Sequence, residues 1–216
     1  MGGEVISSHP IPALEAKVAA MKLMEHGVYF EVYSNKGAFT NDKEKSLAVL
    51  VDIFMSANPD IDINEVLKSA EARFEHGLVQ VVDDYEKLFS NEETKIYKFL
   101  AFSLELEKLA LVRDALENME TIVVSSSGHE NLEITSTDAQ KGIALEAFSA
   151  SKDISLAETM AIGDNFNDLS MFKRAGKSVA MGNASDVIKA QCDLTTASNA
   201  EDGVAQAIYE AIKASV

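Results

Sequence analysis

The stretch from Met160 to Leu169 constrains the fold more than any other part of the sequence. A short apolar run ends at Gly163, and two acids and two amides follow directly: Asp164, Asn165, Asn167 and Asp168. Such a step places oxygen ligands at the carboxyl end of a buried strand, where open α/β sheets bind ligands. Carboxylate and amide oxygens suit Mg²⁺ and phosphate rather than zinc. An acidic turn that only caps a helix would use the same residue types.

Length and charge limit the class of protein. A chain of 216 residues can form one large or two small domains, and 47% hydrophobic with 25% charged residues is typical of a soluble globular protein. The formal charge of −16 argues against nucleic acid, because binding to its phosphates needs a basic face. No run approaches the roughly 18 apolar residues of a membrane-spanning helix. With one cysteine and no signal-peptide pattern, the sequence predicts a cytoplasmic protein without a membrane partner, of open oligomeric state.

Hydrophobic periodicity predicts two different arrangements of secondary structure, one before and one after about residue 135. Before it, strands and helices come in pairs, which predicts an α+β layer with helices on one face of an antiparallel sheet. After it, single helices alternate with single strands, as in a parallel sheet built from βαβ units. Strands are expected at 3–6, 28–33, 38–40, 78–82, 94–102, 121–125, 132–135, 159–163, 178–181 and 194–196. Helices are expected at 12–26, 41–55, 62–77, 85–89, 104–118, 137–151, 167–175, 185–191 and 201–213.

Capping residues predict where several helices begin. Four pairs have the required spacing: Asn41 with Glu44, Asp62 with Glu65, Thr137 with Gln140, and Ser155 with Glu158.

Two acidic pairs have the residue types and spacing of phosphotransfer motifs but lack the strands and helices that surround such motifs. Asp60 and Asp62 follow Asn58-Pro59 rather than a buried strand, and Asp83-Asp84 is not followed by alternating strands and helices. We therefore interpret both pairs as structural.

Lys141 is expected in the first turn of the helix at 137–151. A cation is unfavourable for the helix dipole at that end, but beside free backbone N–H groups it suits a phosphate. An isolated lysine there would be an ordinary solvated side chain. The acidic loop at 163–168 favours the phosphate role, because a lysine and a bound metal complement each other around one phosphate.

Four segments carry a resemblance to a known family by their order and spacing: Asp138–Gly142, Gly163–Asp168, Val179–Ala184 and Asn199–Ala205. They closely resemble the Cof-type phosphatases of the haloacid dehalogenase superfamily, nearest to the YhaX-like members. The resemblance extends through the chain and implies an α/β fold. Residues 1–12 would be a remnant at the core edge, 13–134 an α+β cap domain of C2 type, and 135–216 the C-terminal half of a Rossmann-like parallel core.

The resemblance also implies a function and the residues that perform it. The family consists of Mg²⁺-dependent phosphatases of small phosphorylated metabolites, sugar phosphates among them. Lys141 would be a catalytic residue that stabilises the phosphate, and Asn167 would bind the same phosphate. Asp164 would ligate Mg²⁺ with help from Asn165. Asp168 would be a catalytic residue that orients the loop.

The chain departs from the family at its start. Members carry an apolar strand ending in Asp-x-Asp-Gly-Thr, whose first aspartate is the nucleophile and whose second is the general acid/base, and this motif does not occur here. Nor is there the Ser or Thr that binds phosphate after the next strand. Gly3–Ile6 corresponds to the region just before the cap, so about the first 70 family residues are expected to be missing.

Two hypotheses follow from this departure. Covalent phosphoryl transfer cannot proceed without an activated nucleophile, so the chain is either a truncated phosphatase, inactive without that segment, or a non-catalytic remnant. The remnant would bind a phosphorylated ligand or a protein partner. In both cases the strand at 159–163 loses its neighbour and becomes an exposed apolar edge.

Overall fold

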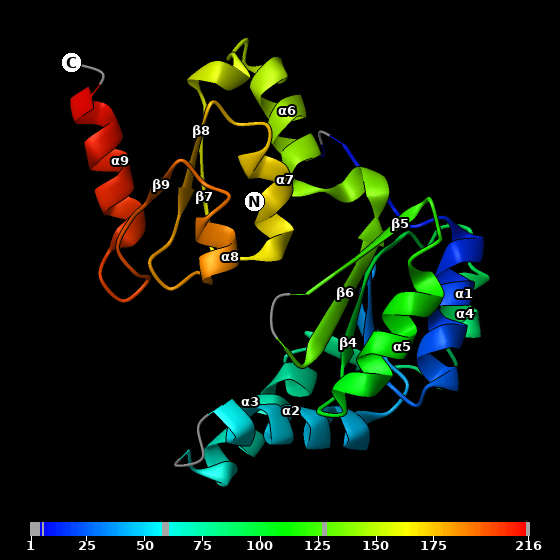
Figure 1. Ribbon diagram of the computed structural model, residues 1–216. Helices are drawn as coiled ribbons and strands as arrows, with labels where there is room; N and C mark the ends of the chain where they lie inside the picture. The colour runs from blue at the N-terminus through cyan, green and yellow to red at the C-terminus, as the bar shows by residue number, and fades with distance from the viewer. Residues whose placement is uncertain (1–4, 6, 58–60, 127–128, 215–216) are drawn as a thin grey trace. The chain divides into compact units, whose positions relative to one another are not determined.

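The computed structural model describes residues 5, 7–57, 61–126 and 129–214 (Figure 1). The chain divides into two compact units, Met1–Asp138 and Ala139–Val216. The expected strand at 3–6 lies almost wholly outside the described residues, as does the Asn58-Pro59 break. Across the described residues, every helix is too short or too polar to span a bilayer.

The first unit is built on a six-stranded mixed sheet with the order β3-β2-β1-β4-β6-β5. Its neighbours pair antiparallel except β2 and β3, which are parallel, so the expected antiparallel sheet was wrong at this point. The reason is that two helices connect β2 to β3, and a crossover of that length returns the chain in the same direction. The strands are β1 (Tyr29–Ser34), β2 (Gly37–Thr40), β3 (Val79–Val81), β4 (Ile96–Phe102), β5 (Ile122–Ser125) and β6 (Asn131–Ser136).

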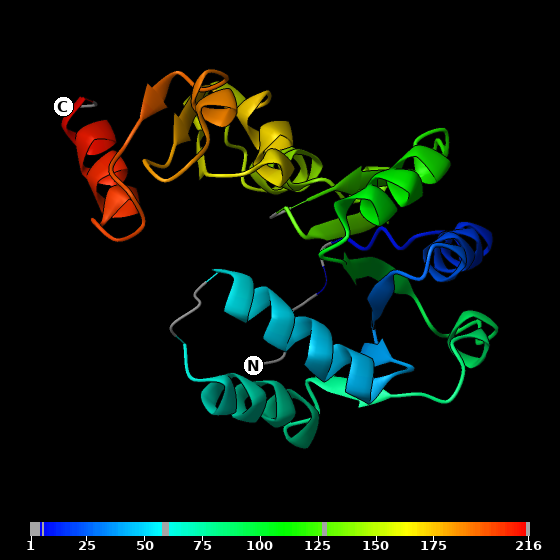
Figure 2. The ribbon, with the colours of Figure 1, turned by 60° about the horizontal axis from the view of Figure 1, so that its bottom comes forward.

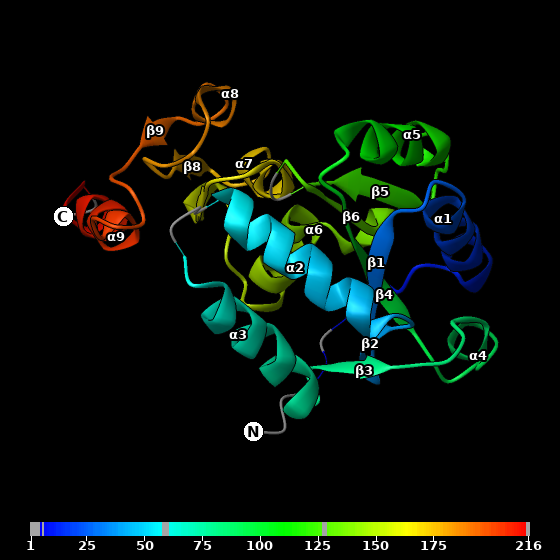
Figure 3. The ribbon, with the colours of Figure 1, turned by 90° about the horizontal axis from the view of Figure 1, so that it is seen from below.

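Helices cover both faces of this sheet, whereas one covered face was expected (Figure 3). One face carries α1 (Ala13–Glu25), α4 (Glu86–Phe89) and α5 (Leu106–Leu116). The other carries α2 (Lys43–Ala57) and α3 (Ile63–Glu75), which run side by side in Figure 2. The second layer exists because the residues of β1 alternate between two buried environments.

One of these two environments of β1 is apolar, and it is the main core of the first unit. Phe30 and Val32 of β1 pack there with apolar side chains of α1, α5 and β4, around the fully buried Phe99. Tyr85 stacks on Phe30 with ring centroids 4.8 Å apart, and its hydroxyl donates to the Phe30 carbonyl at 2.8 Å. Ile11 belongs to the same core and forms an isolated bridge with β4.

The opposite face of β1 holds an ion pair between a buried carboxylate and a partly exposed arginine. Glu31 is fully buried and accepts hydrogen bonds from Arg73 of α3 and from the Tyr33 hydroxyl, each at 2.9 Å. A buried carboxylate is tolerated only when it is paired and hydrogen-bonded, so these contacts fasten α3 to the sheet. Burial, together with the Glu31 charge, raises the pKa of Tyr33 to about 12.

The second unit is a three-stranded sheet with the order β7-β8-β9, in which both pairings are parallel, as expected. Single helices alternate with its strands, which confirms the predicted βαβ pattern. The strands are β7 (Met160–Gly163), β8 (Lys177–Ala180) and β9 (Leu194–Thr195). The helices are α6 (Lys141–Ser151), α7 (Leu169–Phe172), α8 (Asp186–Lys189) and α9 (Gly203–Ala214). Figure 1 shows α9 on one side of the strands and α6 and α7 on the other.

Two helix caps differ from expectation. Asp42, not Asn41, caps α2, because its Oδ1 accepts the N–H of Lys45 at 2.8 Å. Thr137 does not cap α6: it lies in a 3-10 turn, its hydroxyl donates to the Glu120 carbonyl, and α6 begins only at Lys141. Asp62 and Ser155 cap their helices as predicted.

Candidate active site

The loop after β7 is organised by the carboxylate of Asp168. The strand ends at Gly163, a 3-10 turn spans Phe166–Asp168, and α7 follows. Asp168 is buried, and its Oδ2 accepts the backbone N–H groups of Asp164 at 3.0 Å and Asn165 at 3.1 Å. The side chain therefore folds back and fixes the backbone of the acidic stretch.

The other oxygen of Asp168 holds Lys141. Its Oδ1 lies 2.5 Å from the ammonium nitrogen of Lys141, the first residue of α6. The Lys141 side chain is 51% exposed and that of Asp168 is 6% exposed, so the buried carboxylate fixes a cation that still faces solvent. An ammonium has three donors, and one bond to Asp168 leaves it able to bind an anion as well.

Two glycines permit this close approach. A Cβ at Gly163 would lie 2.5 Å from Asp168 Oδ2, so a side chain there would displace the carboxylate. A Cβ at Gly142 would collide with the backbone carbonyl of Ser170, while the Gly142 N–H donates to the Ser170 hydroxyl at 2.9 Å. The start of α6 therefore packs against α7, which brings Lys141 to Asp168.

Asp164 is exposed and is oriented by Asn183, a residue to which the sequence analysis gave no role. Asn183 donates from its side-chain nitrogen to Asp164 Oδ2 at 3.0 Å, and its Oδ1 accepts the N–H of Asn199 at 3.0 Å. Asn183 thus joins the loops after β7, β8 and β9. The available signal was an amide directly after Gly182 at the end of a predicted strand, which is where sheet-edge ligands gather.

The two remaining predicted residues lie in the turn itself. The Oδ1 of Asn165 accepts the N–H of Phe166 at 2.8 Å, and Asn165 and Asp168 form a capping box for the 3-10 turn. Its side-chain oxygen therefore has a structural bond, and its part at a metal stays a prediction. Asn167 is half-buried within the turn, and its contact with phosphate also stays a prediction.

The side-chain oxygens of this loop are the type of ligand that Mg²⁺ prefers, but they supply only part of a metal site. Asp164 presents a carboxylate, whereas both oxygens of Asp168 are engaged, Oδ2 by the loop backbone and Oδ1 by Lys141 of α6. Among the described residues no three His, Cys, Asp or Glu side chains cluster closely enough to hold a metal. Mg²⁺ is commonly held by one or two carboxylates plus substrate phosphate and water, so Asp164 can serve as one of its ligands.

Comparisons with known proteins show which family the chain resembles over its length. Residues 1–208 match the model of the haloacid dehalogenase-like hydrolases. The phosphatase YwpJ of Bacillus subtilis is 36% identical over 185 residues, which are 85% of this chain and 65% of that protein. The 5-amino-6-(5-phospho-D-ribitylamino)uracil phosphatase YwtE of the same organism is 34% identical over 205 residues, covering 94% of this chain and 71% of YwtE.

A solved structure has the same fold. A haloacid dehalogenase-like hydrolase from B. subtilis superimposes with a TM-score of 0.77 at 35% identity, over 91% of this chain and 70% of that one. The chain thus spans about two thirds of the length of these relatives.

Proposed function

Because the chain belongs to the haloacid dehalogenase-like hydrolase family, we propose that it is the larger part of a Mg²⁺-dependent phosphatase. Its substrates are small phosphorylated metabolites, sugar phosphates among them. The observation that carries this proposal is the bonding of Asp168, whose carboxylate holds Lys141 and the backbone of Asp164 together. The relative YwtE is a phosphatase named for a small phosphorylated ribityl compound, which supports the substrate class.

Each residue of the loop has a role in this proposal. Lys141 binds the phosphate and stabilises the negative charge that develops on it during transfer. Asp168 fixes Lys141 and the loop, Asn183 orients Asp164, and Asn167 contributes to phosphate binding. Asp164 would hold Mg²⁺, assisted by Asn165, and the bound ion would supply positive charge at the phosphoryl oxygens.

The nucleophile comes from outside the 216 residues. In the proposed reaction a carboxylate attacks phosphorus and the alcohol leaves, and water then hydrolyses the acyl phosphate. The strand that ends in Asp-x-Asp-Gly-Thr would lie beside β7, so the chain alone is inactive. Residues 13–134 would act as the cap domain that excludes water and selects the substrate, and residues 135–216 would belong to the core domain.

Hydrolysis of p-nitrophenyl phosphate with Mg²⁺ tests the proposal. We expect no turnover from the 216-residue chain, and turnover once the part of YwpJ outside its match to this chain is fused in front of it. In the active fusion, Lys141→Ala should lower kcat about 100-fold or more, because one charge-stabilising donor is lost. Lys152→Ala, at the other end of α6, is the matched control and should leave kcat unchanged.

The other outcomes are equally informative. Turnover by the chain alone that disappears in Asp164→Ala would overturn the claim that it lacks its nucleophile. A correctly folded fusion without turnover, which still binds inorganic phosphate through Lys141, would favour the non-catalytic hypothesis.

A further inference from the structure

The two oxygens of the Asp164 carboxylate have different surroundings. Its Oδ2 accepts a hydrogen bond from the side-chain nitrogen of Asn183 at 3.0 Å. Its Oδ1 accepts no hydrogen bond from any residue that the structure describes. Because Asp164 is exposed, one of its oxygens is held by the protein while the other is available to an ion from solution.

The backbone of a neighbouring loop fixes which end of the Asn183 amide faces Asp164. The N–H of Asn199 donates to Asn183 Oδ1 at 3.0 Å. A backbone N–H can only donate, so the side-chain oxygen of Asn183 lies toward Asn199 and its side-chain nitrogen lies toward Asp164. A flipped amide would set two acceptors against each other at Asp164 and two donors against each other at Asn199. Asn183 therefore presents a donor to the carboxylate in one fixed orientation.

The loop that carries Asn199 packs closely against the loop that carries Asn183. A Cβ at Gly182 would lie 2.7 Å from the backbone nitrogen of Ser198, so the two loops meet through their backbones. The carbonyl of Ser198 accepts the N–H of Gly203 at 3.1 Å, where α9 begins. The loop after β9 is thus held on one side by the loop after β8 and on the other by α9.

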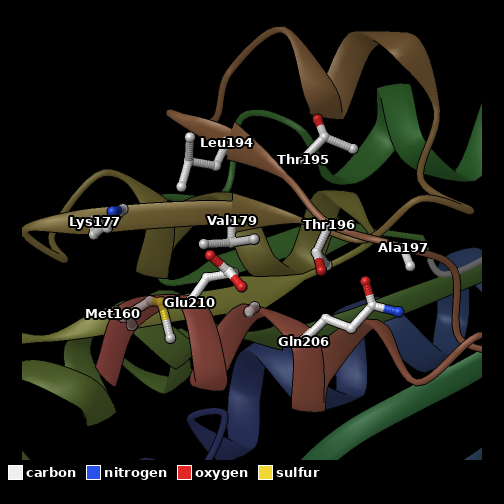
Figure 4. A pocket seen from close by; sticks show the side chains of 11 residues that line it. Met160, Lys177, Val179, Leu194, Thr195, Thr196, Ala197, Gln206 and Glu210 are labelled. Carbon is white, nitrogen blue, oxygen red and sulfur yellow. The ribbon is translucent and has the colours of Figure 1, made fainter. Parts of the chain in front are cut away.

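Hydrogen bonds also hold this loop beside a cavity. The cavity, of about 430 Å³, lies between the sheet and α9 and is bordered by Thr196 and Gln206 (Figure 4). The hydroxyl of Thr196 donates to the Gly203 carbonyl at 2.7 Å, and the side-chain nitrogen of Gln206 donates to the Glu201 carbonyl at 2.8 Å. These bonds tie both ends of the loop to α9, so the Asn199 N–H keeps its place although packing is incomplete here.

Mg²⁺ and Ca²⁺ make different demands on a carboxylate. Mg²⁺ is small and needs near-ideal octahedral geometry, which one carboxylate oxygen satisfies, whereas the larger Ca²⁺ takes more oxygens and often both from one carboxylate. An ion bound by both oxygens of Asp164 would approach Oδ2, where the N–H of Asn183 already places partial positive charge. An ion bound by Oδ1 alone would leave that hydrogen bond intact.

We propose that Asn183 determines the cation specificity of Asp164. By holding Oδ2, it limits Asp164 to binding through one oxygen and so favours Mg²⁺ over Ca²⁺. Asn183 is a positioning residue, since it acts on the ion only through Asp164. The inference rests on the proposed function for one point, the assignment of Asp164 as a metal ligand.

Cation titrations of the 216-residue chain test this role. Magnesium chloride and calcium chloride are added separately, and the amide signals of Asp164 and Asn165 are followed by nuclear magnetic resonance to give a dissociation constant for each ion. Asn183→Ala should lower the ratio of the Ca²⁺ to the Mg²⁺ dissociation constant by about 3- to 10-fold, because one solvent-exposed hydrogen bond is lost. Gln191→Ala, which removes an exposed amide of the same unit, is the matched control and should leave the ratio unchanged.

The Asp164→Ala variant separates this role from the proposed function. If that variant abolishes the signal shifts but Asn183→Ala keeps the wild-type ratio, the specificity role is overturned and Asp164 remains a metal ligand. If neither ion shifts the wild-type signals, or Asp164→Ala titrates like wild type, the metal role of Asp164 is overturned and the specificity role with it. A lowered ratio at an unchanged urea midpoint in Asn183→Ala would support the specificity role, because the fold is then intact.

Discussion

The two sheets of this molecule differ in how completely they are covered. The six-stranded sheet has helices on both faces and a core centred on the fully buried Phe99. The three-stranded sheet has one packed face, a cavity against its other face and, among the described residues, unpaired outer edges on β7 and β9. The predicted catalytic residues all lie in the less complete unit. Stability and chemistry are therefore unequally divided along the chain, and the two units should respond differently to perturbation.

The largest expected difference concerns the cores. Phe99→Ala should lower the free energy of unfolding of the first unit by about 3–5 kcal/mol, because it leaves a cavity in a large, fully buried core. Phe172→Ala should cost the second unit less, since its core is small and can collapse more easily. Urea titration followed by segment-resolved hydrogen exchange measures both. Equal losses of unfolding free energy in the two units would contradict the expected difference between the large core of the first unit and the small core of the second.

The same contrast governs how much of the fold was predictable. Alternating and helical patterns place nearly every element, because they record only which face of each segment is buried. The direction of β3 was missed, since a strand has the same local pattern whether its partner runs parallel or antiparallel. The second helical layer was missed because it packs on a polar face, where Glu31 binds Arg73 across 42 residues.

A smaller effect is expected from Gly163→Ala. The added methyl group would displace Asp168, which should cost the second unit about 1–3 kcal/mol and separate Lys141 from the loop. Gly27→Ala is the control: it also strains a glycine, one with a φ of 65°, but that glycine lies in the first unit and not in the Asp168 loop. Hydrogen exchange at residues 163–169 should quicken in the first variant only. Unchanged exchange there would contradict the role given to the Asp168 carboxylate.

The candidate site was predictable in its parts but not in its connections. Asp164, Asp168 and Lys141 have distinctive residue types at the ends of predicted elements. The bonds among them depend on side-chain directions, so the structural role of the Asn165 oxygen was missed. Asn183 was missed because it lies 19 residues from Asp164 and meets it only after two strands align.

The smallest effect concerns alkaline pH. Burial raises the pKa of Tyr85 to about 12, and Tyr33 has a similarly raised pKa of about 12, against an ordinary value of 10.0. Above pH 10 the unfolded chain loses these protons first, so the first unit keeps its full stability below pH 10. It should lose stability as the pH rises toward 12, by on the order of 1 kcal/mol at about half a unit above 10, most of it from the buried Tyr85 because solvent screens the partly exposed Tyr33. Tyrosinate absorbance and urea titration follow this, and a flat stability curve would contradict it.

The two N–H groups that donate to Asp168 have a practical consequence. The amides of Asp164 and Asn165 share one carboxylate oxygen, while its other oxygen binds Lys141. Anything that draws Lys141 away, such as a bound anion, changes the charge those two protons experience. Their nuclear magnetic resonance signals should shift together on ligand binding, which gives a spectroscopic probe of the lysine without any introduced label.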